Sequence, residues 1–292
     1  MSKIKYYLNW FKLNLFTIKP TVLAIELTNN CQAGCIMCGH ELMQRKVENM
    51  NFELFKKIID DAKSNDIKVF QLSFYGEPLL YHDLINATKY ISDTIPESVI
   101  VINTNAYYLS KEKSQQLLNA GIKLFSISVD GNNKEEFEKI RPGLKWDTIY
   151  ENIKNLRQII DQSSQNAQIH IRGLHLKNYP IDESLYHQTW GQFADKIQIR
   201  NEHDLDKLEG ETIINKLIPC HRIMSQMVVL ANGEVTICAY DWAGSQKYGN
   251  LQSNSILDLW FRWNNIKLRL IHLLGLKRTL SYCRDCTYKV HR

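Results

Sequence analysis

The stretch "NNCQAGCIMCGH", residues 29–40, carries three cysteines in a C-x3-C-x2-C spacing, at Cys31, Cys35 and Cys38. It follows "TVLAIEL" (21–27), a short β-branched run that predicts a strand. The cysteines therefore fall in the loop after the first predicted strand. The chain shows no clear secretory signal, so we expect a cytoplasmic protein whose thiols stay reduced. There, clustered cysteines indicate metal binding or catalysis before disulfide pairing.

Three thiolates in one loop leave one ligand position of a metal centre to be filled from elsewhere. A tetrahedral zinc site needs a fourth ligand, which His40 is able to supply. A [4Fe–4S] cluster is normally held by four cysteines, so a set of three leaves one iron open to an exogenous ligand. Both types of site agree with these residues alone.

Apolar runs typical of strands alternate with stretches of helical periodicity from residue 21 to about residue 205. This alternation predicts an α/β fold with a parallel sheet. Six units are too few for a complete eight-fold barrel, so a partial (β/α)6 TIM-like barrel and a doubly wound sheet both agree with the pattern. Strands are predicted at 21–27, 67–74, 98–104, 122–130, 167–176 and 196–200, and helices at 51–63, 79–93, 110–121, 148–160 and 182–192.

The pattern changes after about residue 205. "MVVLANGEVTIC" (227–238) predicts a hairpin that turns at Asn232-Gly233. Residues 255–275 predict a helix with an apolar stripe and a terminal glycine. This part of the chain is therefore expected to form a small α+β domain.

We accordingly expect three segments: an N-terminal amphipathic helix or extension at 1–20, the barrel core at 21–205 and the α+β domain at 206–292. The four remaining cysteines all lie in the last segment, at Cys220, Cys238, Cys283 and Cys286. Four thiolates suit either a structural zinc ion or one iron–sulfur cluster.

Composition excludes some classes of partner. A net charge of +5 without a Lys/Arg block does not fit a nucleic-acid-binding arm. No apolar run approaches the roughly 20 residues that span a bilayer, so we expect no stable membrane insertion. Residues 6–18 predict an amphipathic helix, which either lies on a membrane surface or packs under the barrel as a lid. We favour the lid, because the polar face has few lysines.

The cysteine spacing, together with motifs at later strand ends, resembles the radical S-adenosylmethionine (SAM) superfamily. "YGEP" (75–78) after the second strand is similar to the Gly-Gly-Glu motif of that family, and "NTNA" (103–106) after the third is similar to Thr-Asn-Gly. "SISVDG" (126–131) ends the fourth strand, and "KIRPG" (139–143) follows it. The resemblance covers residues 21–292 and implies the partial barrel.

The resemblance implies that the three loop cysteines hold a [4Fe–4S] cluster whose open iron binds SAM. The carboxylate of Glu77 would serve the SAM ammonium, and Arg141 would pair with the SAM carboxylate through two parallel hydrogen bonds. The chain departs from the family at Met37, where an aromatic residue is usual, and at Tyr75 and Ala106, which replace glycines. The implied SAM contacts are Met37, Gly76, Glu77, Thr104, Asn105, Ser128, Asp130 and Arg141.

The C-terminal cysteines and their surroundings resemble the SPASM/twitch appendage, which carries an auxiliary iron–sulfur cluster. Four cysteines are enough for one [4Fe–4S] cluster, so the resemblance implies two such clusters in the chain. The spacings of 18, 45 and 3 residues are similar to those of 2-deoxy-scyllo-inosamine dehydrogenases. The alternative is a structural zinc site with four cysteine ligands.

Together these resemblances imply a radical SAM oxidoreductase. Reductive cleavage of SAM gives a 5′-deoxyadenosyl radical, which abstracts hydrogen from a substrate C–H bond, and the substrate's electron passes to the auxiliary cluster. We expect dehydrogenation of a small polyol, aminocyclitol or sugar, with a flavodoxin- or ferredoxin-type electron donor. Candidate substrate or base residues are Asp241, Tyr240, His203 and Arg200. Asp241 is also suited to capping the turn after the hairpin.

Two other functions are compatible with the sequence. Many peptide-modifying enzymes, which form a thioether or epimerise a residue, carry an extra N-terminal peptide-binding domain, whereas about 30 residues precede Cys31 here. A non-catalytic iron–sulfur or zinc protein has no need of SAM contacts such as Glu77, Asn105, Ser128 and Arg141. The sequence therefore favours the small-molecule oxidoreductase.

Overall fold

The computed structural model describes residues 18–201, 219–238, 241, 244 and 246–284. Within them, one sheet has the strand order β6-β5-β4-β3-β2-β1-β7-β8-β9. The strands are β1 (Val22–Ile25), β2 (Val69–Gln71), β3 (Val99–Thr104), β4 (Ile122–Ser128), β5 (Gln168–His175), β6 (Lys196–Asn201), β7 (Gln226–Val229), β8 (Glu234–Thr236) and β9 (Lys247–Asn250). The helix predicted within residues 1–20 falls almost entirely outside the described residues.

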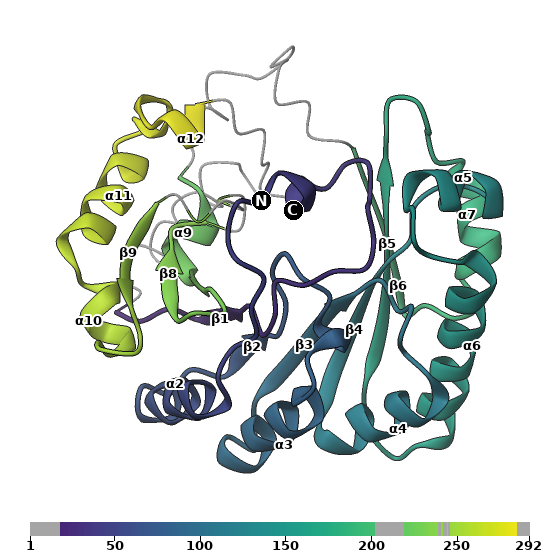
Figure 1. Cartoon of the computed structure of the whole chain (residues 1–292), viewed down its shortest axis with the longest axis horizontal. Helices are drawn as coiled ribbons and strands as arrows, with labels where there is room; N and C mark the ends of the chain where they lie inside the picture. The colour runs from purple at the N-terminus through teal and green to yellow at the C-terminus, as the bar shows by residue number, and fades with distance from the viewer. Residues whose placement is uncertain (1–17, 202–218, 239–240, 242–243, 245, 285–292) are drawn as a thin grey trace, which may run out of the picture.

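Strands β1 to β6 pair in parallel with their neighbours in chain order. The helices between them lie on the outer side of the curved sheet (Figure 1). In the described residues β6 and β9 are the sheet edges, so the barrel is open and the predicted fold class is confirmed. The outer helices are α2 (Phe52–Ser64), α3 (Leu84–Thr94), α4 (Lys111–Ala120), α5 (Lys134–Ile140), α6 (Trp146–Gln162) and α7 (Glu183–Trp190). The short helix α5 was not predicted.

Capping residues explain where several helices begin and end. The side chain of Asn51 accepts hydrogen bonds from the backbone N–H groups of Glu53 and Leu54, as its predicted N-cap role requires. Gly121 ends α4 in the left-handed conformation with a φ of 108°, which glycine adopts without steric cost. Helix α3 begins later than predicted, because Pro78–Leu80 form a separate 3-10 turn, η2.

The C-terminal part of the chain continues the same sheet. Strand β7 pairs in parallel with β1, and the short helix α9 (His221–Ser225) leads into it. The predicted hairpin is confirmed: β7 and β8 are antiparallel and turn through Gly233, whose φ is 81°. The boundary predicted near residue 205 falls outside the described residues and stays a prediction.

The single helix predicted at 255–275 is wrong, because the structure divides this stretch into α10 (Ile256–Trp260) and α11 (Trp263–Leu273). The backbone leaves the helical conformation at Arg262, where φ is −61° and ψ is 139°. The carbonyl of Trp260 accepts hydrogen bonds from Nδ2 of Asn265 at 2.9 Å and from Nη2 of Arg269 at 2.6 Å. These donors satisfy a carbonyl that the helix end leaves unpaired, and so they stabilise the break. Two short helices follow, η3 (Lys277–Thr279) and α12 (Ser281–Arg284).

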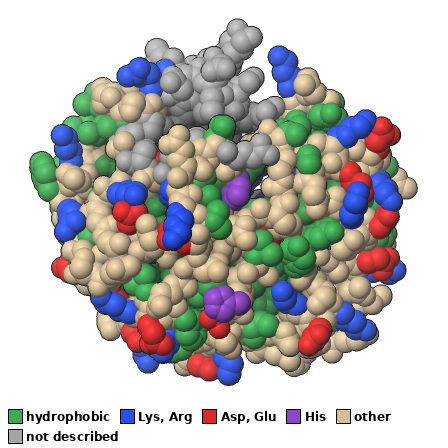
Figure 2. Space-filling model, viewed as in Figure 1, with side chains coloured by type: hydrophobic (Ala, Val, Ile, Leu, Met, Phe, Trp, Pro, Cys, Tyr) green, Lys and Arg blue, Asp and Glu red, His purple; other side chains and the backbone are tan. Residues whose placement is uncertain are grey.

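The core lies between the sheet and its outer helices. Leu23, Phe70, Ile102, Phe125 and Ile171 come from strands β1 to β5 and are fully buried. Charged side chains of both signs surround one face of the molecule, with hydrophobic side chains nearer its centre (Figure 2). Among the described residues, no helix is both long and apolar enough to cross a membrane.

The N-cap of α2 gives a first test of this description. Replacing Asn51 with Ala removes the acceptor for two backbone N–H groups, so the free energy of unfolding should fall by about 1 kcal/mol. Asn51→Asp keeps an acceptor oxygen and should remain close to the wild type. Urea denaturation of the purified proteins measures both, and equal losses in the two variants would contradict the capping role.

Candidate active site

A pocket of about 340 Å³ opens where the loops after the parallel strands converge. Its volume lies at the lower end of the range for small-molecule sites. Seven of the site residues predicted from the sequence line it, namely Cys35, Met37, Cys38, Ser128, Asp130, Arg141 and Arg200. The remaining lining residues are Gly39, Tyr75, Arg172, Gly173 and Leu174.

The cysteine loop rests on the C-terminal end of α5 and the turn after it. The N–H of Gly34 donates to the carbonyl of Pro142 at 2.9 Å, and that of Ile36 donates to Ile140 at 3.0 Å. Cys31, Cys35 and Cys38 are half-buried free thiols. Burial raises the pKa of Cys31 to about 11 and also raises the pKa of Cys35. Iron–sulfur clusters are held by thiolates, so a cluster bound at this loop would take the place of these protons.

The zinc site considered for this loop does not fit its geometry. In the described part of the chain, no three His, Cys, Asp or Glu side chains lie close enough together to hold one metal ion. The Nε2 atom of His40 lies 2.8 Å from the carbonyl oxygen of Asn29, so it acts as a hydrogen-bond donor there and not as a ligand.

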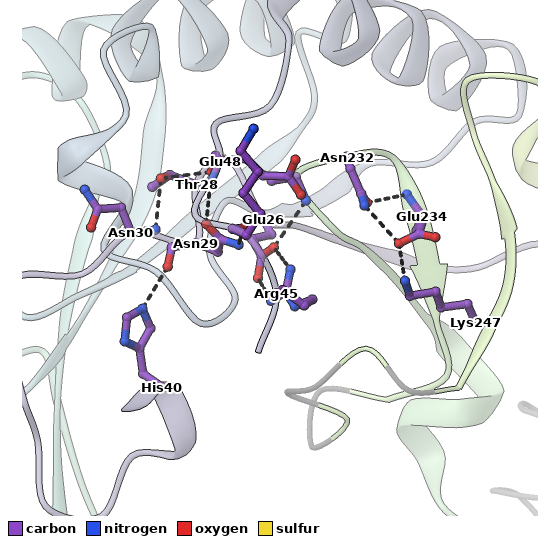
Figure 3. Close-up of polar contacts among 12 residues, drawn as sticks. Glu26, Thr28, Asn29, Asn30, His40, Arg45, Glu48, Asn232, Glu234 and Lys247 are labelled. Carbon is purple, nitrogen blue, oxygen red and sulfur yellow. Dashed lines mark hydrogen bonds and ion pairs between the residues drawn. The ribbon is translucent and has the colours of Figure 1, made fainter. Parts of the chain in front are cut away.

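A buried ion pair joins Glu26, which precedes the cysteine loop, to Arg45, which follows it (Figure 3). Nη1 and Nη2 of Arg45 lie 2.6 and 2.8 Å from the two carboxylate oxygens of Glu26, at the end of β1. Oε1 of Glu26 also accepts from the N–H of Ala231, in the β7–β8 turn. The side chain of Asn29 adds bonds to the backbone of Lys46 and Glu48. The loop is thereby tied to both parts of the sheet.

Glu77 lies behind the pocket wall. It is 3% exposed and accepts hydrogen bonds from the hydroxyl of Thr104 at 2.6 Å and from the N–H groups of Asn105 and Leu79 at 2.8 and 3.1 Å. Burial raises the pKa of its carboxyl group, although these three donors oppose the shift. Glu77 thus joins the ends of β2 and β3, and its predicted contact with SAM stays a prediction.

Gly76 is needed for a close approach of two loops. A Cβ atom at this position would lie 2.2 Å from the carbonyl oxygen of Thr28, well inside any allowed contact. The next residue continues the contact, because the N–H of Glu77 donates to the carbonyl of Asn30 at 2.8 Å. Asn105 reaches the same loop, since its Oδ1 accepts from Gln32 at 3.3 Å. The structure therefore brings Gly76, Glu77, Thr104 and Asn105 together with the cysteine loop.

Asp130 and Arg141 form a buried pair in the pocket wall. Nε and Nη2 of Arg141 lie 2.9 and 2.5 Å from Oδ2 of Asp130, while Oδ1 accepts from the N–H of Leu174 at 2.7 Å. Burial opposes the charge of Arg141, but the Asp130 carboxylate more than offsets this and holds the pKa of the guanidinium above its usual value. Nη1 of Arg141 lies 3.7 Å from the sulfur of Cys35. This arginine therefore links the fourth strand to the cysteine loop.

The sequence did not single out His272, which lies between two cysteines of the C-terminal set. The N–H of Cys220 donates to Nδ1 of His272 at 3.3 Å, and Nε2 lies 3.5 Å from the sulfur of Cys283. Burial lowers the pKa of this histidine to about 4, so its ring is neutral. Because Nδ1 accepts, the proton is on Nε2, which can donate to the Cys283 sulfur. Cys238 is also a half-buried free thiol, and Cys286 lies outside the described residues.

The four candidate substrate or base residues have different positions. Arg200 lines the pocket. Asp241 is buried and accepts hydrogen bonds from the hydroxyl of Thr236 and, at 2.8 Å, from the N–H of Gln246. It therefore holds the turn after the hairpin, and the structure does not bring it to the pocket wall. His203 and Tyr240 lie outside the described residues.

Arg172 is a pocket residue that the sequence analysis missed. It stands at the centre of β5 between the buried residues Ile171 and Gly173. In a strand with alternating burial, every second side chain points into the barrel. A charged residue at one of those positions could have identified Arg172 as a pocket residue from the sequence.

Two known families match separate parts of the chain. A profile of the radical SAM superfamily matches residues 25–171, about half of the chain. A profile described as an iron–sulfur cluster-binding domain, SPASM, matches residues 220–287. The two profiles contain the first three and the last four cysteines, respectively. Iron–sulfur clusters and SAM are thus implied by both the motifs and the families.

One curated relative and two solved structures are similar over most of the chain. The S-adenosyl-L-methionine-dependent 2-deoxy-scyllo-inosamine dehydrogenase of Niallia circulans is 22% identical over 268 residues, which cover 91% of this chain and 92% of the relative. BtrN in complex with AdoMet and 2-DOIA has a TM-score of 0.63 at 20% identity, covering 92% of this chain and 93% of BtrN. Streptococcus suis SuiB bound to the precursor peptide SuiA has a TM-score of 0.70 at 15% identity, covering 90% and 69%. At these identities the structures show a shared fold alone.

Substitutions at the ion pair between Glu26 and Arg45 test its contribution to stability. Arg45→Met leaves the fully buried Glu26 carboxylate without its counter-charge, and this should lower the free energy of unfolding by about 3–5 kcal/mol. The double variant Glu26→Gln/Arg45→Met removes the isolated charge and should recover part of that loss. Chemical denaturation of the three proteins measures the coupling. Additive losses in the double variant would show that the two side chains do not act as a pair.

Proposed function

Because the chain belongs to the radical SAM superfamily, we propose that it is an oxidoreductase that dehydrogenates a hydroxyl-bearing carbon of a small polyol, aminocyclitol or sugar. The observation that supports this most directly is the similarity to the Niallia circulans dehydrogenase, which spans 91% of this chain and 92% of that enzyme.

We assign the two cysteine sets to two [4Fe–4S] clusters. Cys31, Cys35 and Cys38 hold the first, with one iron left for SAM, and Cys220, Cys238, Cys283 and Cys286 hold the auxiliary one. When bound, these groups supply the hydrogen abstraction and the one-electron transfers by which an alcohol and SAM give a ketone, methionine, 5′-deoxyadenosine and a proton. A flavodoxin- or ferredoxin-type protein supplies the initiating electron.

The residues of the pocket orient the reactants. Arg141, which is held by Asp130 and lies 3.7 Å from the sulfur of Cys35, is the proposed partner of the SAM carboxylate, and Met37 and Ser128 line the same pocket. Arg200 positions the substrate but does not act as the base, because a guanidinium stays protonated. The carboxylate of Asp241 is engaged in its turn. Tyr240 and His203 are therefore the proposed proton acceptors.

Peptide modification is the alternative function. The similarity to peptide-bound SuiB rests on 15% identity, and this chain covers 69% of that protein. It therefore concerns the fold and does not favour a peptide substrate.

Metal content and SAM cleavage test the proposal. Anaerobic reconstitution should give about eight irons per chain, as two [4Fe–4S] clusters require, and reduction with SAM should release 5′-deoxyadenosine. Cys31→Ala should abolish this release, whereas Cys283→Ala should retain part of it and lose substrate oxidation. About four irons with zinc retained would exclude the auxiliary cluster. The absence of 5′-deoxyadenosine under every reducing condition would exclude the reaction.

The contact between His272 and Cys283 gives a second prediction. Hydrogen bonds to cluster sulfurs raise the reduction potential, so His272→Leu should lower the potential of the auxiliary cluster. His272→Gln retains an N–H donor and should change it less. Redox titration followed by electron paramagnetic resonance separates the two clusters. An equal shift in both clusters, or none in either, would exclude a specific bond to Cys283.

A further inference from the structure

Two arginines on adjacent strands face the same side of the sheet in the pocket. Arg172 of β5 pairs in register with Gln198 of β6, and Leu174 pairs with Arg200. Residues two apart on a strand share a face, so the guanidinium groups of Arg172 and Arg200 are diagonal neighbours. Both line the pocket that Cys35 and Cys38 also line.

Neither of these arginines has a carboxylate partner among the residues that the structure describes. Nε of Arg172 is buried without a hydrogen-bond partner, and its Nη1 reaches only Oδ1 of Asn103, at 3.5 Å. The acidic side chain of the same pocket, Asp130, is fully used by Arg141 and the N–H of Leu174. Burial, followed by the charges of Arg200 and Arg222, lowers the pKa of Arg172 to about 10. It is still protonated at neutral pH.

Within the part of the chain that the structure describes, this arrangement is unfavourable unless an anion joins it. Positive charges that are close together and partly removed from water destabilise each other, and such groups are normally paired. The pocket contains a direct comparison: Arg141 has its carboxylate, whereas Arg172 and Arg200 lack one among the described residues. Planar guanidinium groups bind carboxylates and phosphates through parallel hydrogen bonds.

We propose that the substrate carries a phosphate or carboxylate group, which binds between Arg172 and Arg200 and directs the reacting carbon toward the side of the pocket lined by Cys35 and Cys38. This inference rests on the proposed function and narrows it. A sugar or polyol bearing an anionic group fits the pocket, whereas a cationic aminocyclitol meets two positive charges. The substrate class would then differ from that of an inosamine dehydrogenase.

Equilibrium binding tests this without turnover. The reconstituted, unreduced protein is saturated with SAM and titrated anaerobically with glucose 6-phosphate, glucuronate, glucose and glucosamine. Glucose 6-phosphate or glucuronate should bind at least 10-fold more tightly than glucose and glucosamine. Whichever of these two anions binds more tightly identifies the group as phosphate or carboxylate. Glucose or glucosamine binding as tightly as both anions would overturn the proposal. A parallel titration without SAM is the control: anion binding that is seen only without SAM would also overturn the proposal, because the arginines would then serve the SAM carboxylate.

Variants locate the binding. Arg172→Gln and Arg200→Gln should each lower the affinity for the tighter-binding anion by roughly 10- to 100-fold, the range for a lost charged hydrogen bond. Arg172→Lys keeps the charge but loses the planar fork, so its loss should be smaller. Arg157→Gln is the matched control, because Arg157 lies on α6 and pairs with Asp161 and Asp195. Thermal unfolding checks that each variant is folded, and unchanged affinity in folded Arg172 and Arg200 variants would refute the site.

The binding and turnover results separate this inference from the proposed function. Arginine-dependent anion binding in a protein that oxidises no hydroxyl compound would support the site and exclude the dehydrogenase. Oxidation of a neutral or cationic polyol that binds more tightly than either anion would support the dehydrogenase and exclude the anion site.

Discussion

The ion pair between Glu26 and Arg45 is the contact on which the arrangement of the site depends. Parallel strands bring all their following loops to one edge of the sheet, and buried polar groups there must find partners. Glu26 meets this need for the cysteine loop and the β7–β8 turn together. Glu77 does the same between β2 and β3, and Asp130 between β4, β5 and Arg141. Three buried carboxylates thus connect loops that are distant in the sequence.

Local patterns predicted the elements well, because their signals lie within a few residues. The alternation from residue 21 onward gave the parallel order, and Asn232-Gly233 located the hairpin. The break between α10 and α11 was missed, because it depends on side chains of Asn265 and Arg269 reaching back to Trp260. Short motifs also located much of the site, and the expected role of Asp241 in the turn after the hairpin is confirmed. They did not reveal that Glu77 uses its carboxylate to join the ends of β2 and β3.

Arg172 and His272, which the sequence analysis did not identify, both owe their surroundings to residues that are distant in the sequence. The environment of Arg172 comes from β6, and that of His272 from two cysteines placed 52 residues before it and 11 residues after it. Neither residue belongs to a spacing motif, so only the folded arrangement shows what surrounds it. Their surroundings differ: the burial of His272 keeps its ring neutral between the backbone N–H of Cys220 and the sulfur of Cys283, whereas Arg172 stays charged in the pocket. The first suits tuning of a metal centre, and the second suits recognition of a ligand.

The two residues at the start of the "YGEP" motif differ in how far they tolerate change. Gly76 has no room for a side chain, because the backbone at Thr28 already occupies the space that a Cβ would need. Tyr75, by contrast, lines the pocket. A substitution at position 75 can therefore change the shape of the pocket, whereas position 76 does not accept a side chain. Within this motif, packing fixes the residue at position 76, whereas the residue at position 75 shapes the pocket, so the pocket can change without disturbing the contact with the cysteine loop.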